Sequence, residues 1–344
     1  MLAKRFAKIG PPTRPLLPVY RNPEPDELYF KFFNTYAKEN YLWVDTKCLC
    51  GNDDDQLIST TDRHGVEYHC VICNSCGLIR PKKYLRDEDI KDFYTFHYRD
   101  TCKDSILPAK DKWSVQAEQS RYRIELIKKH SNFKFENEQV LVDIGGAAGG
   151  FFDGYTEKCK CILFDYFEPY LEYARKKGVS TIMGGLKELN LANIKPDLIV
   201  INHVVEHWNN FELEVDELIK ACKKDKTLIY IEFPGVDSLK NGRRGGDLLG
   251  DIHIPHFYYF ASYVFTNIME RKGFKEIFID DETRAIYIYT GEKKKLINNY
   301  KKVWNDLLEA ETTRHVYTVK HFIRLFIPNF ILSLKRKFIK SAIR

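Results

Sequence analysis

A strand that ends in a glycine-rich turn is the feature that most limits the fold of this chain. Residues 139–152 read QVLVDIGGAAGGFF, in which an apolar run carries one acid, Asp143, and then breaks into glycine and alanine. A strand, a tight turn and the start of a helix in this order bring backbone N–H groups close to a ligand. We therefore expect a strand over 140–144, a ligand-binding turn after it, and a helix that begins near Phe151.

Strand-like and helix-like segments alternate after this turn. Further apolar runs read as strands, at 161–165, 179–183, 196–202, 227–233, 274–279 and 285–290. Helical spacing covers three segments, 168–178, 212–222 and 258–272. Such alternation at short spacing is typical of a parallel sheet with helices on both faces. We predict an α/β fold with a Rossmann-like, doubly wound sheet of seven strands, whose last strand pairs antiparallel with its neighbour at the sheet edge.

The spacing inside the glycine turn indicates which cofactor it binds. It reads D-x-G-x-A-x-G, whereas a dinucleotide fingerprint would read G-x-G-x-x-G. The form D-x-G-x-G-x-G is that of enzymes that use S-adenosylmethionine (SAM). The next strand ends in Asp165, at the position where a nucleotide ribose finds the partner of its hydroxyl groups. The sequence therefore predicts a SAM site formed by Asp143, Gly145, Gly146, Ala147, Gly149, Asp165, Tyr166, Asn202 and His203.

Two short cysteine knuckles, each followed by glycine, precede the glycine turn. The knuckles are C-x-C-G at 48–51 and C-x-x-C-G at 73–77, and the residues between them alternate like a hairpin around a turn at 62–65. Four thiolates suit tetrahedral Zn²⁺ and leave no ligand position for a catalytic water. We predict a structural zinc ribbon held by Cys48, Cys50, Cys73 and Cys76, with His69 and Cys70 as spare candidates.

Buried thiols that pack as small apolar side chains are the main alternative for this cysteine cluster, and redox chemistry is the least favoured one. The remaining cysteines are scattered along the chain, and we expect them in the core: Cys102, Cys159, Cys161 and Cys222.

Residues from about 45 to 290 resemble class I SAM-dependent methyltransferases with an N-terminal zinc-binding segment. Such enzymes are found among those that modify sugars and surface polysaccharides, including the nucleotide-sugar C-methyltransferases. The stretches that carry the resemblance are the two knuckles, FY…YR at 93–99, VDIGGAAGG at 142–150, Asp165, HVVEH at 203–207 and HIPHFYYF at 253–260. This chain departs from the pattern in Ala147, which replaces the middle glycine, and in lacking the large second Rossmann-like domain of the sugar C-methyltransferases.

The histidine-rich segments supply candidate catalytic residues. HVVEH follows a predicted strand, so it lies at the carboxyl edge of the sheet, where ligands bind in open α/β folds. Methyl transfer to a neutral sugar hydroxyl needs alignment and removal of the acceptor's proton. We predict His207 as the general base and His256 as the second candidate, with Glu206 orienting the imidazole and His253 in a loop that contacts substrate.

Each of these residues also has a purely structural interpretation. His203 can pack beside SAM at the strand end, and Glu206 and His207 can cap a helix start. His253 and His256 can belong to a loop that covers the site. The aromatic residues at 93–98 and 257–260 can be packing faces.

The charge is unevenly distributed. The formal net charge is +6, yet residues 293–344 hold 13 Lys and Arg against 3 Asp and Glu, and residues 1–22 hold 5 Lys and Arg and no acid. The interior is therefore acidic, so we expect no nucleic-acid partner. We predict O-methylation of a saccharide or nucleotide-linked sugar. Two alternatives stay open: a zinc-ribbon RNA-binding methyltransferase and a non-catalytic zinc-ribbon scaffold.

The basic tail is predicted to be amphipathic. From Val316 onward apolar residues recur at three- and four-residue spacing among lysines and arginines, and Pro328 kinks or breaks the helix. This pattern fits a membrane-surface anchor and fits equally well a helix docked on the body. With no long apolar run and no secretory signal, we expect a cytoplasmic protein, with contact at the inner face of the membrane as an open alternative.

The sequence thus divides into five segments: an N-terminal arm (1–44), a zinc-ribbon-like segment (45–84), a helical linker or cap (85–136), a SAM-binding Rossmann-like domain (137–292) and a basic amphipathic tail (293–344).

Overall fold

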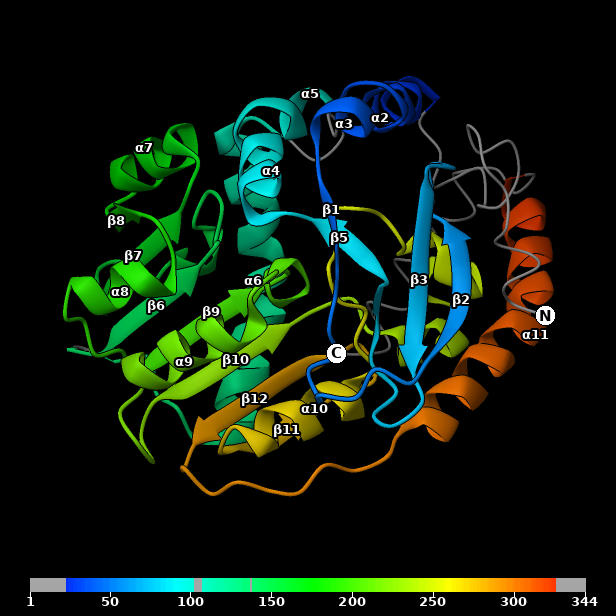
Figure 1. The fold of residues 1–344 in the computed structure, drawn as a ribbon. Helices are drawn as coiled ribbons and strands as arrows, with labels where there is room; N and C mark the ends of the chain where they lie inside the picture. Colours follow the sequence, from blue (N-terminus) through cyan, green and yellow to red (C-terminus); the bar gives the residue numbers. More distant parts are fainter. Residues whose placement is uncertain (1–22, 102–106, 137, 326–344) are drawn as a thin grey trace.

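A computed structural model describes residues 23–101, 107–136 and 138–325, and a seven-stranded sheet crosses its centre (Figure 1). The strands are β6 (Val140–Ile144), β7 (Lys160–Asp165), β8 (Ser180–Met183), β9 (Leu198–Asn202), β10 (Leu228–Glu232), β11 (Phe274–Ile279) and β12 (Arg284–Tyr289). Their order across the sheet is β11-β12-β10-β9-β6-β7-β8. β12 is antiparallel to both of its neighbours, and the pairs from β10 to β8 are parallel. The predicted doubly wound sheet with an antiparallel last strand is therefore confirmed.

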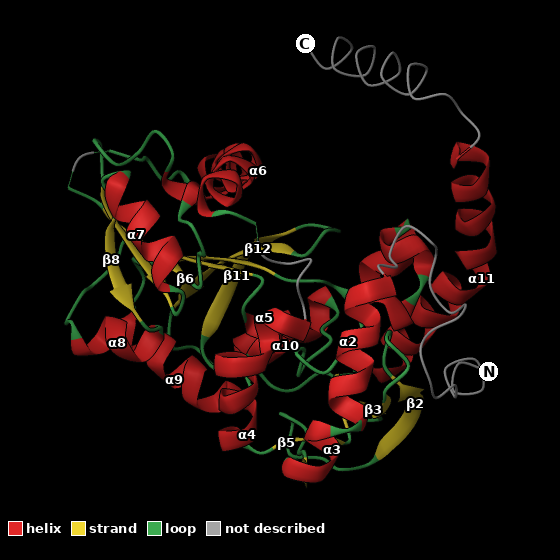
Figure 2. Cartoon of the chain, turned by 90° about the horizontal axis from the view of Figure 1, so that it is seen from above, coloured by secondary structure: helices red, strands yellow, loops and turns green. Residues whose placement is uncertain are grey.

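Helices cover both faces of this sheet (Figure 2). They are α6 (Ala109–Ser131), α7 (Glu168–Lys176), α8 (Leu186–Leu191), α9 (Phe211–Ala221) and α10 (Ser262–Arg271). α6 and α7 pack on one face of the sheet, and α8, α9 and α10 pack on the other. The central strands are apolar at almost every position because both faces are buried.

The predicted helix after the glycine turn is wrong. Only a 3₁₀ turn, η4 (Gly150–Phe152), follows β6, and the chain then runs through turns to β7. Helix α6 occupies the neighbouring space, since a Cβ atom on Gly150 would lie 2.3 Å from the carbonyl oxygen of Trp113. The predicted helix over 258–272 begins later, at Ser262, because Tyr259 pairs in an extended bridge with Ile79.

The N-terminal part of the chain packs against the sheet domain in one continuous apolar core. It begins with α2 (Pro23–Asn34) and α3 (Tyr36–Asn40) and ends with α4 (Asp87–Asp92), a π-helical turn η2 (Phe93–His97) and α5 (Tyr98–Thr101). Between them lie β1 (Trp43–Asp45), β2 (Asp55–Thr61), β3 (Glu67–Cys73), β4 (Ile79–Pro81) and β5 (Lys83–Leu85). β2 and β3 form the predicted antiparallel hairpin, β4 extends it, and β1 pairs with β5.

Helix α11 (Tyr300–Leu325) packs against an irregular segment that follows β10. This segment contains the 3₁₀ turns η6 (Val236–Asn241), η7 (Arg243–Gly246) and η8 (Leu248–Gly250). Lys240 Nζ and the Tyr263 hydroxyl both donate to the carboxylate of Asp306 on α11, at 2.8 Å each. Most of the predicted amphipathic tail, and Cys102, lie outside the described residues. Among the helices that are described, none is long and apolar enough to cross a membrane.

Candidate functional site

The glycine turn after β6 contains left-handed backbone at three positions. Gly145, Ala147 and Gly149 have φ values of 66°, 49° and 81°. A left-handed conformation disfavours residues with a Cβ atom, so Ala147 stands where glycine would be less strained. The chain keeps this conformation because the turn is held on both sides, and strain of this kind is common at ligand sites.

Asp143 lies directly beneath the turn. A Cβ atom on Gly146 would meet the Asp143 carboxylate at 2.2 Å, so only glycine fits between this acid and the turn. Burial raises the pKa of Asp143 to about 8, against a lowering by the Arg123 guanidinium. One of its oxygens has no hydrogen-bond partner among the described residues, which leaves an acceptor beneath the turn.

Asp165 ends β7 and braces the same turn from its other side. Its Oδ2 accepts the N–H of Ala147, and its Oδ1 accepts the N–H of Phe167, at 2.9 Å each. The adjacent Tyr166 is 74% exposed. Asp165 thus lies at the position predicted from sequence, at the carboxyl ends of two neighbouring parallel strands.

Helix α6 supplies residues to this site that the sequence analysis missed. Gln116 Nε2 donates to the carbonyl of Gly146 at 2.9 Å, and Gln116 Oε1 accepts the N–H of Gly150 at 3.4 Å. A polar cavity of about 20 Å³ lies between the helix and the turn, and Arg123 and Asn202 line it with Asp143. No motif marks these α6 residues, because the helix precedes β6 and its role depends on tertiary packing.

We expect Gln116→Ala to weaken SAM binding by roughly 3- to 10-fold, because the turn loses two side-chain hydrogen bonds of modest strength. Calorimetric titration with SAM measures the effect. Gln119→Ala, an exposed position on the same helix, is the matched control and should bind as the wild type does. Equal affinities for the two variants would show that the helix does not position the turn.

A chain of charged side chains links α6 to the strand end of β9. Arg123 makes two hydrogen bonds to the Glu232 carboxylate, at 2.7 and 3.1 Å. His203, in left-handed backbone with φ 55°, has its ring nitrogens 3.6 Å from Glu232 and 3.4 Å from Glu206. Against the effect of burial, the two carboxylates raise the pKa of His203 to about 9. The two carboxylates therefore favour the charged form of His203, which suits a charged scaffold better than a base.

His207 is held in a defined orientation. It lies on the 3₁₀ turn η5 (Val205–His207), and its Nδ1 is 2.8 Å from the carbonyl oxygen of Pro255. A carbonyl oxygen only accepts, so Nδ1 carries the proton, and Nε2 keeps a lone pair. The hydroxyl of Tyr94 lies 3.0 Å from the same Nδ1 and 3.1 Å from the same carbonyl. These contacts fix the ring plane.

His256 and His253 lie in the loop before α10, and His256 packs between His207 and His253. The ring centroids of His207 and His256 are 4.8 Å apart, and those of His256 and His253 are 4.0 Å apart. Burial and neighbouring positive groups lower the pKa of both loop histidines well below the usual value. His253 is only 7% exposed, and neither of its ring nitrogens has a partner among the described residues.

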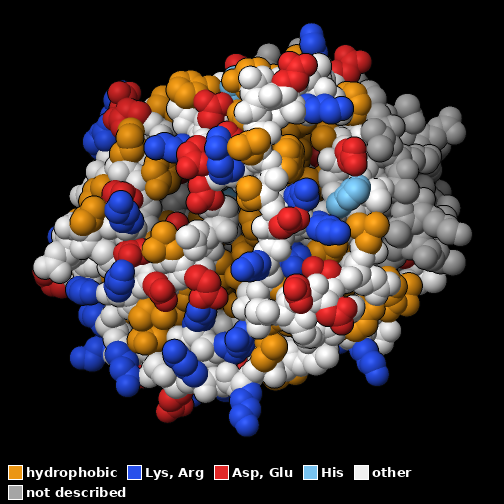
Figure 3. All heavy atoms as spheres, in the orientation of Figure 1, with side chains coloured by type: hydrophobic (Ala, Val, Ile, Leu, Met, Phe, Trp, Pro, Cys, Tyr) orange, Lys and Arg blue, Asp and Glu red, His pale blue; other side chains and the backbone are white. Residues whose placement is uncertain are grey.

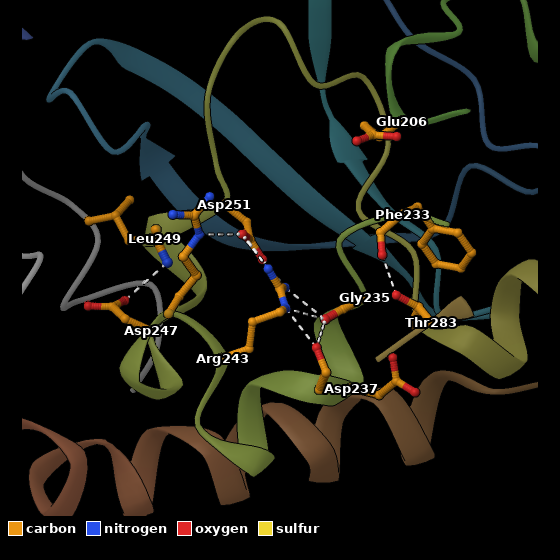
Figure 4. A network of polar contacts seen from close by, with 12 residues as sticks. Glu206, Phe233, Gly235, Asp237, Arg243, Asp247, Leu249, Asp251 and Thr283 are labelled. Atoms are coloured by element: carbon orange, nitrogen blue, oxygen red, sulfur yellow. Dashed lines mark hydrogen bonds and ion pairs between the residues drawn. The ribbon is translucent and has the colours of Figure 1, made fainter. Parts of the chain in front are cut away.

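The loop that carries these histidines is anchored at Asp251, which pairs with Arg244 at 3.3 Å and more extensively with Arg243 (Figure 4). Arg243 donates to both oxygens of the Asp251 carboxylate and to the carbonyl of Gly235. Asp251 is 1% exposed. Because this buried carboxylate is paired with Arg243, the backbone two residues before His253 is held in place. The segment therefore presents its histidines from a rigid base.

The four knuckle cysteines converge in a separate cluster. Their sulfur atoms lie within 4.8 Å of one another, and three of the separations are 3.4, 3.5 and 3.6 Å. Four thiolates around one zinc at 2.3 Å would be about 3.8 Å apart, so the cluster fits a tetrahedral ion. The left-handed Gly51 and Gly77 close the two turns, and Asn52 N–H points at a cysteine sulfur at 3.4 Å.

The other predicted cysteine and histidine candidates lie outside this cluster. Cys70 is fully buried on β3, three residues before Cys73. The His69 imidazole lies 3.5 Å from the Glu67 carboxylate. Cys159 and Cys161 are in the core as expected, and Cys222 packs against it.

A comparison with known protein families supports the interpretation of the fold and of the glycine turn. Residues 116–277 match the model of a family described as a methyltransferase domain. The chain carries a class I SAM-dependent methyltransferase domain. A comparison with curated protein sequences finds no match. The matched range begins within α6 and runs through the parallel strands into β11, so it includes Gln116, the α6 residue that contacts the glycine turn.

Solved structures similar to this methyltransferase include three whose descriptions name methyl transfer. A coclaurine N-methyltransferase is 18% identical, with a TM-score of 0.29, and the match covers 34% of this chain and 35% of that one. A protein from Methanococcus maripaludis described as SAM-dependent is 14% identical, with TM-score 0.38, over 57% and 94%. The magnesium protoporphyrin IX methyltransferase of Synechocystis is 12% identical, with TM-score 0.39, over 59% and 98%. Similarities this low carry no argument about the acceptor.

Proposed function

We propose that this methyltransferase moves the methyl group of SAM to a hydroxyl of a saccharide or nucleotide-linked sugar, with His207 accepting the hydroxyl proton. The observation that carries the proposal is the orientation of His207, whose Nδ1–H is tied to the Pro255 carbonyl. This tautomer leaves Nε2 as the only basic nitrogen of the ring. A base placed within reach of a hydroxyl contributes roughly 10²–10⁴-fold to such a transfer.

A groove between the first cysteine knuckle and residues 209–212 is a candidate place for a sugar-sized acceptor, although neither His207 nor His256 lines it. Its volume is about 480 Å³, within the range of small-molecule sites. Asn209 and Asn210 line it just after His207, and Phe257 and Tyr258 line it just after His256. Amide groups and aromatic rings together supply hydrogen bonds and flat apolar contacts, which a saccharide needs.

The face shown in Figure 3 favours a small acceptor over a nucleic acid. On the face shown in Figure 3, basic and acidic side chains are interspersed, and no basic stripe crosses it. A protein that binds RNA through phosphates needs clustered Lys and Arg. This face therefore offers no such cluster to RNA phosphates.

SAM binding in the proposal depends on Asp165. We expect Asp165→Ala to weaken SAM binding by about one to two decades, because a carboxylate that accepts bonds from the ribose contributes roughly 1.5–3 kcal/mol. The side chain also braces the glycine turn through the Ala147 N–H, so both effects act in the same direction. Calorimetric titration measures the dissociation constant.

The control for this experiment is Asp216→Ala, an exposed carboxylate on α9 that is remote from the turn. It removes the same charge and should leave the dissociation constant unchanged. An unchanged constant in Asp165→Ala as well would mean that the ribose lies elsewhere.

We also propose that the cysteine cluster holds one structural zinc ion. The support is the geometry of the four sulfur atoms, which matches a closed tetrahedral site with no position for water. The knuckles join the β2–β3 hairpin to the rest of the N-terminal part, and a Cβ on Gly77 would contact α11 at Val303. The zinc would thus link two knuckles that are separated by more than twenty residues in the sequence.

A further inference from the structure

A second group of metal-binding side chains lies at the proposed catalytic cluster. Glu206, His207 and His256 each offer one ligand atom, and these atoms all lie within 4.8 Å of one another. Ligands of one ion bound at about 2.1 Å are roughly 3–4 Å apart, so small rotations of the side chains would close the site. The triad comes from two different loops, which the sequence separates by some fifty residues.

Glu206 is buried with an unused acceptor. Its side chain is 1% exposed, and its Oε2 has no hydrogen-bond partner in the part of the chain that is described. A buried carboxylate oxygen without a partner costs free energy, which a bound cation would recover. The backbone carbonyl of the same residue accepts the N–H groups of Phe257 and Tyr258 at 2.7 and 3.2 Å, so the position of Glu206 is fixed.

The two imidazoles have the arrangement expected of metal ligands. His207 donates Nδ1–H to the Pro255 carbonyl, and a histidine that binds a metal typically donates its other N–H to a carbonyl or carboxylate. His256 Nδ1 has no partner among the described residues, although the ring is packed between His207 and His253. Both rings therefore have a lone pair available next to the Glu206 carboxylate.

We propose that Glu206, His207 and His256 form a binding site for a divalent transition-metal ion of the zinc or iron class. Two imidazoles and one carboxylate are a ligand set that these ions use when coordination positions stay open for a substrate. An acceptor hydroxyl bound at an open position would lose its proton more easily. Arg63 and Arg244 act electrostatically on His256, so we expect weaker binding here than at the four thiolates.

The site goes beyond the proposed function and changes one part of it. A metal ion and a proton compete for Nε2 of His207, so the residue acts as a ligand when the ion is bound and as a base when it is not. Methyl transfer from SAM is compatible with both, because the acceptor hydroxyl loses its proton either to the free Nε2 or with the help of the bound ion. The two ideas can therefore fail separately.

Cobalt titration of the purified full chain tests the site. Co²⁺ is added to protein whose cysteine cluster already holds zinc, and visible absorption is recorded. We expect one equivalent of Co²⁺ to bind with weak visible bands and without the strong near-ultraviolet band of cobalt–thiolate bonds. In Glu206→Gln and His256→Ala the affinity should fall by at least about 100-fold. His69→Ala, on the exposed side of β3, is the control and should titrate as the wild type does.

Calorimetric SAM binding by each variant reports whether it is folded. A wild type that shows no weak visible bands, or triad variants that bind SAM and titrate as the wild type does, would overturn the metal site. If the wild type does not titrate while His207→Ala loses turnover, His207 is a base and the proposed function stands. If Co²⁺ binds but no saccharide or nucleotide-sugar acceptor is methylated, the metal site stands and the proposed acceptor is wrong.

Discussion

Replacing His207 by alanine should lower kcat by roughly 10²–10⁴-fold, the largest kinetic effect that we expect from a single substitution. The imidazole is held by Pro255 and Tyr94 so that Nε2 is its basic nitrogen. SAM affinity should stay nearly unchanged, because we propose that the glycine turn and Asp165, not His207, hold the cofactor. Single-turnover kinetics with a sugar acceptor, together with calorimetric SAM binding, separate the two effects.

The control for this loss is His69→Ala, which removes an imidazole from the exposed side of β3. It should retain wild-type turnover. Near-normal turnover of His207→Ala, combined with a large loss in His256→Ala, would assign the base to the loop before α10. The cobalt titration then distinguishes a free base from a metal ligand at either residue.

The sheet could be predicted from sequence because each strand is marked by a local signal. The strands are marked by apolar runs, and each of the seven begins and ends within two residues of its predicted bounds. The helix expected at Phe151 could not be excluded in this way. Its absence depends on α6, whose Trp113 carbonyl occupies the space beside Gly150, and such packing between distant segments leaves no mark in the local sequence.

The candidate site also contains residues that could be predicted from the sequence and residues that could not. Asp165, Glu206 and His207 follow strands directly, so topology alone places them at one edge of the sheet. Gln116, Arg123 and Glu232 were missed. Gln116 and Arg123 reach the site from a helix outside the motif, and Glu232 ends a strand that carries no recognisable signature.

The folded state of the N-terminal part should depend on zinc, and Cys73→Ser tests this dependence most sharply. Cys73 ends β3, is fully buried, and has sulfur contacts across both knuckles. Hydrogen bonds from the thiols of Cys48 and Cys76 lower the pKa of Cys73. Serine provides a poorer ligand, so the variant should lose one zinc per chain by elemental analysis.

The loss of zinc should destabilise the protein by more than about 4 kcal/mol, since structural zinc contributes its binding free energy to folding. We expect the melting temperature to fall by about 10 °C or more. Cys70→Ser is the matched control, because Cys70 is equally buried on the same strand and lies outside the cluster. Both variants bury a hydroxyl, so the difference between their melting temperatures reports the metal alone. Equal melting temperatures and an unchanged zinc content would mean that the four thiols only pack.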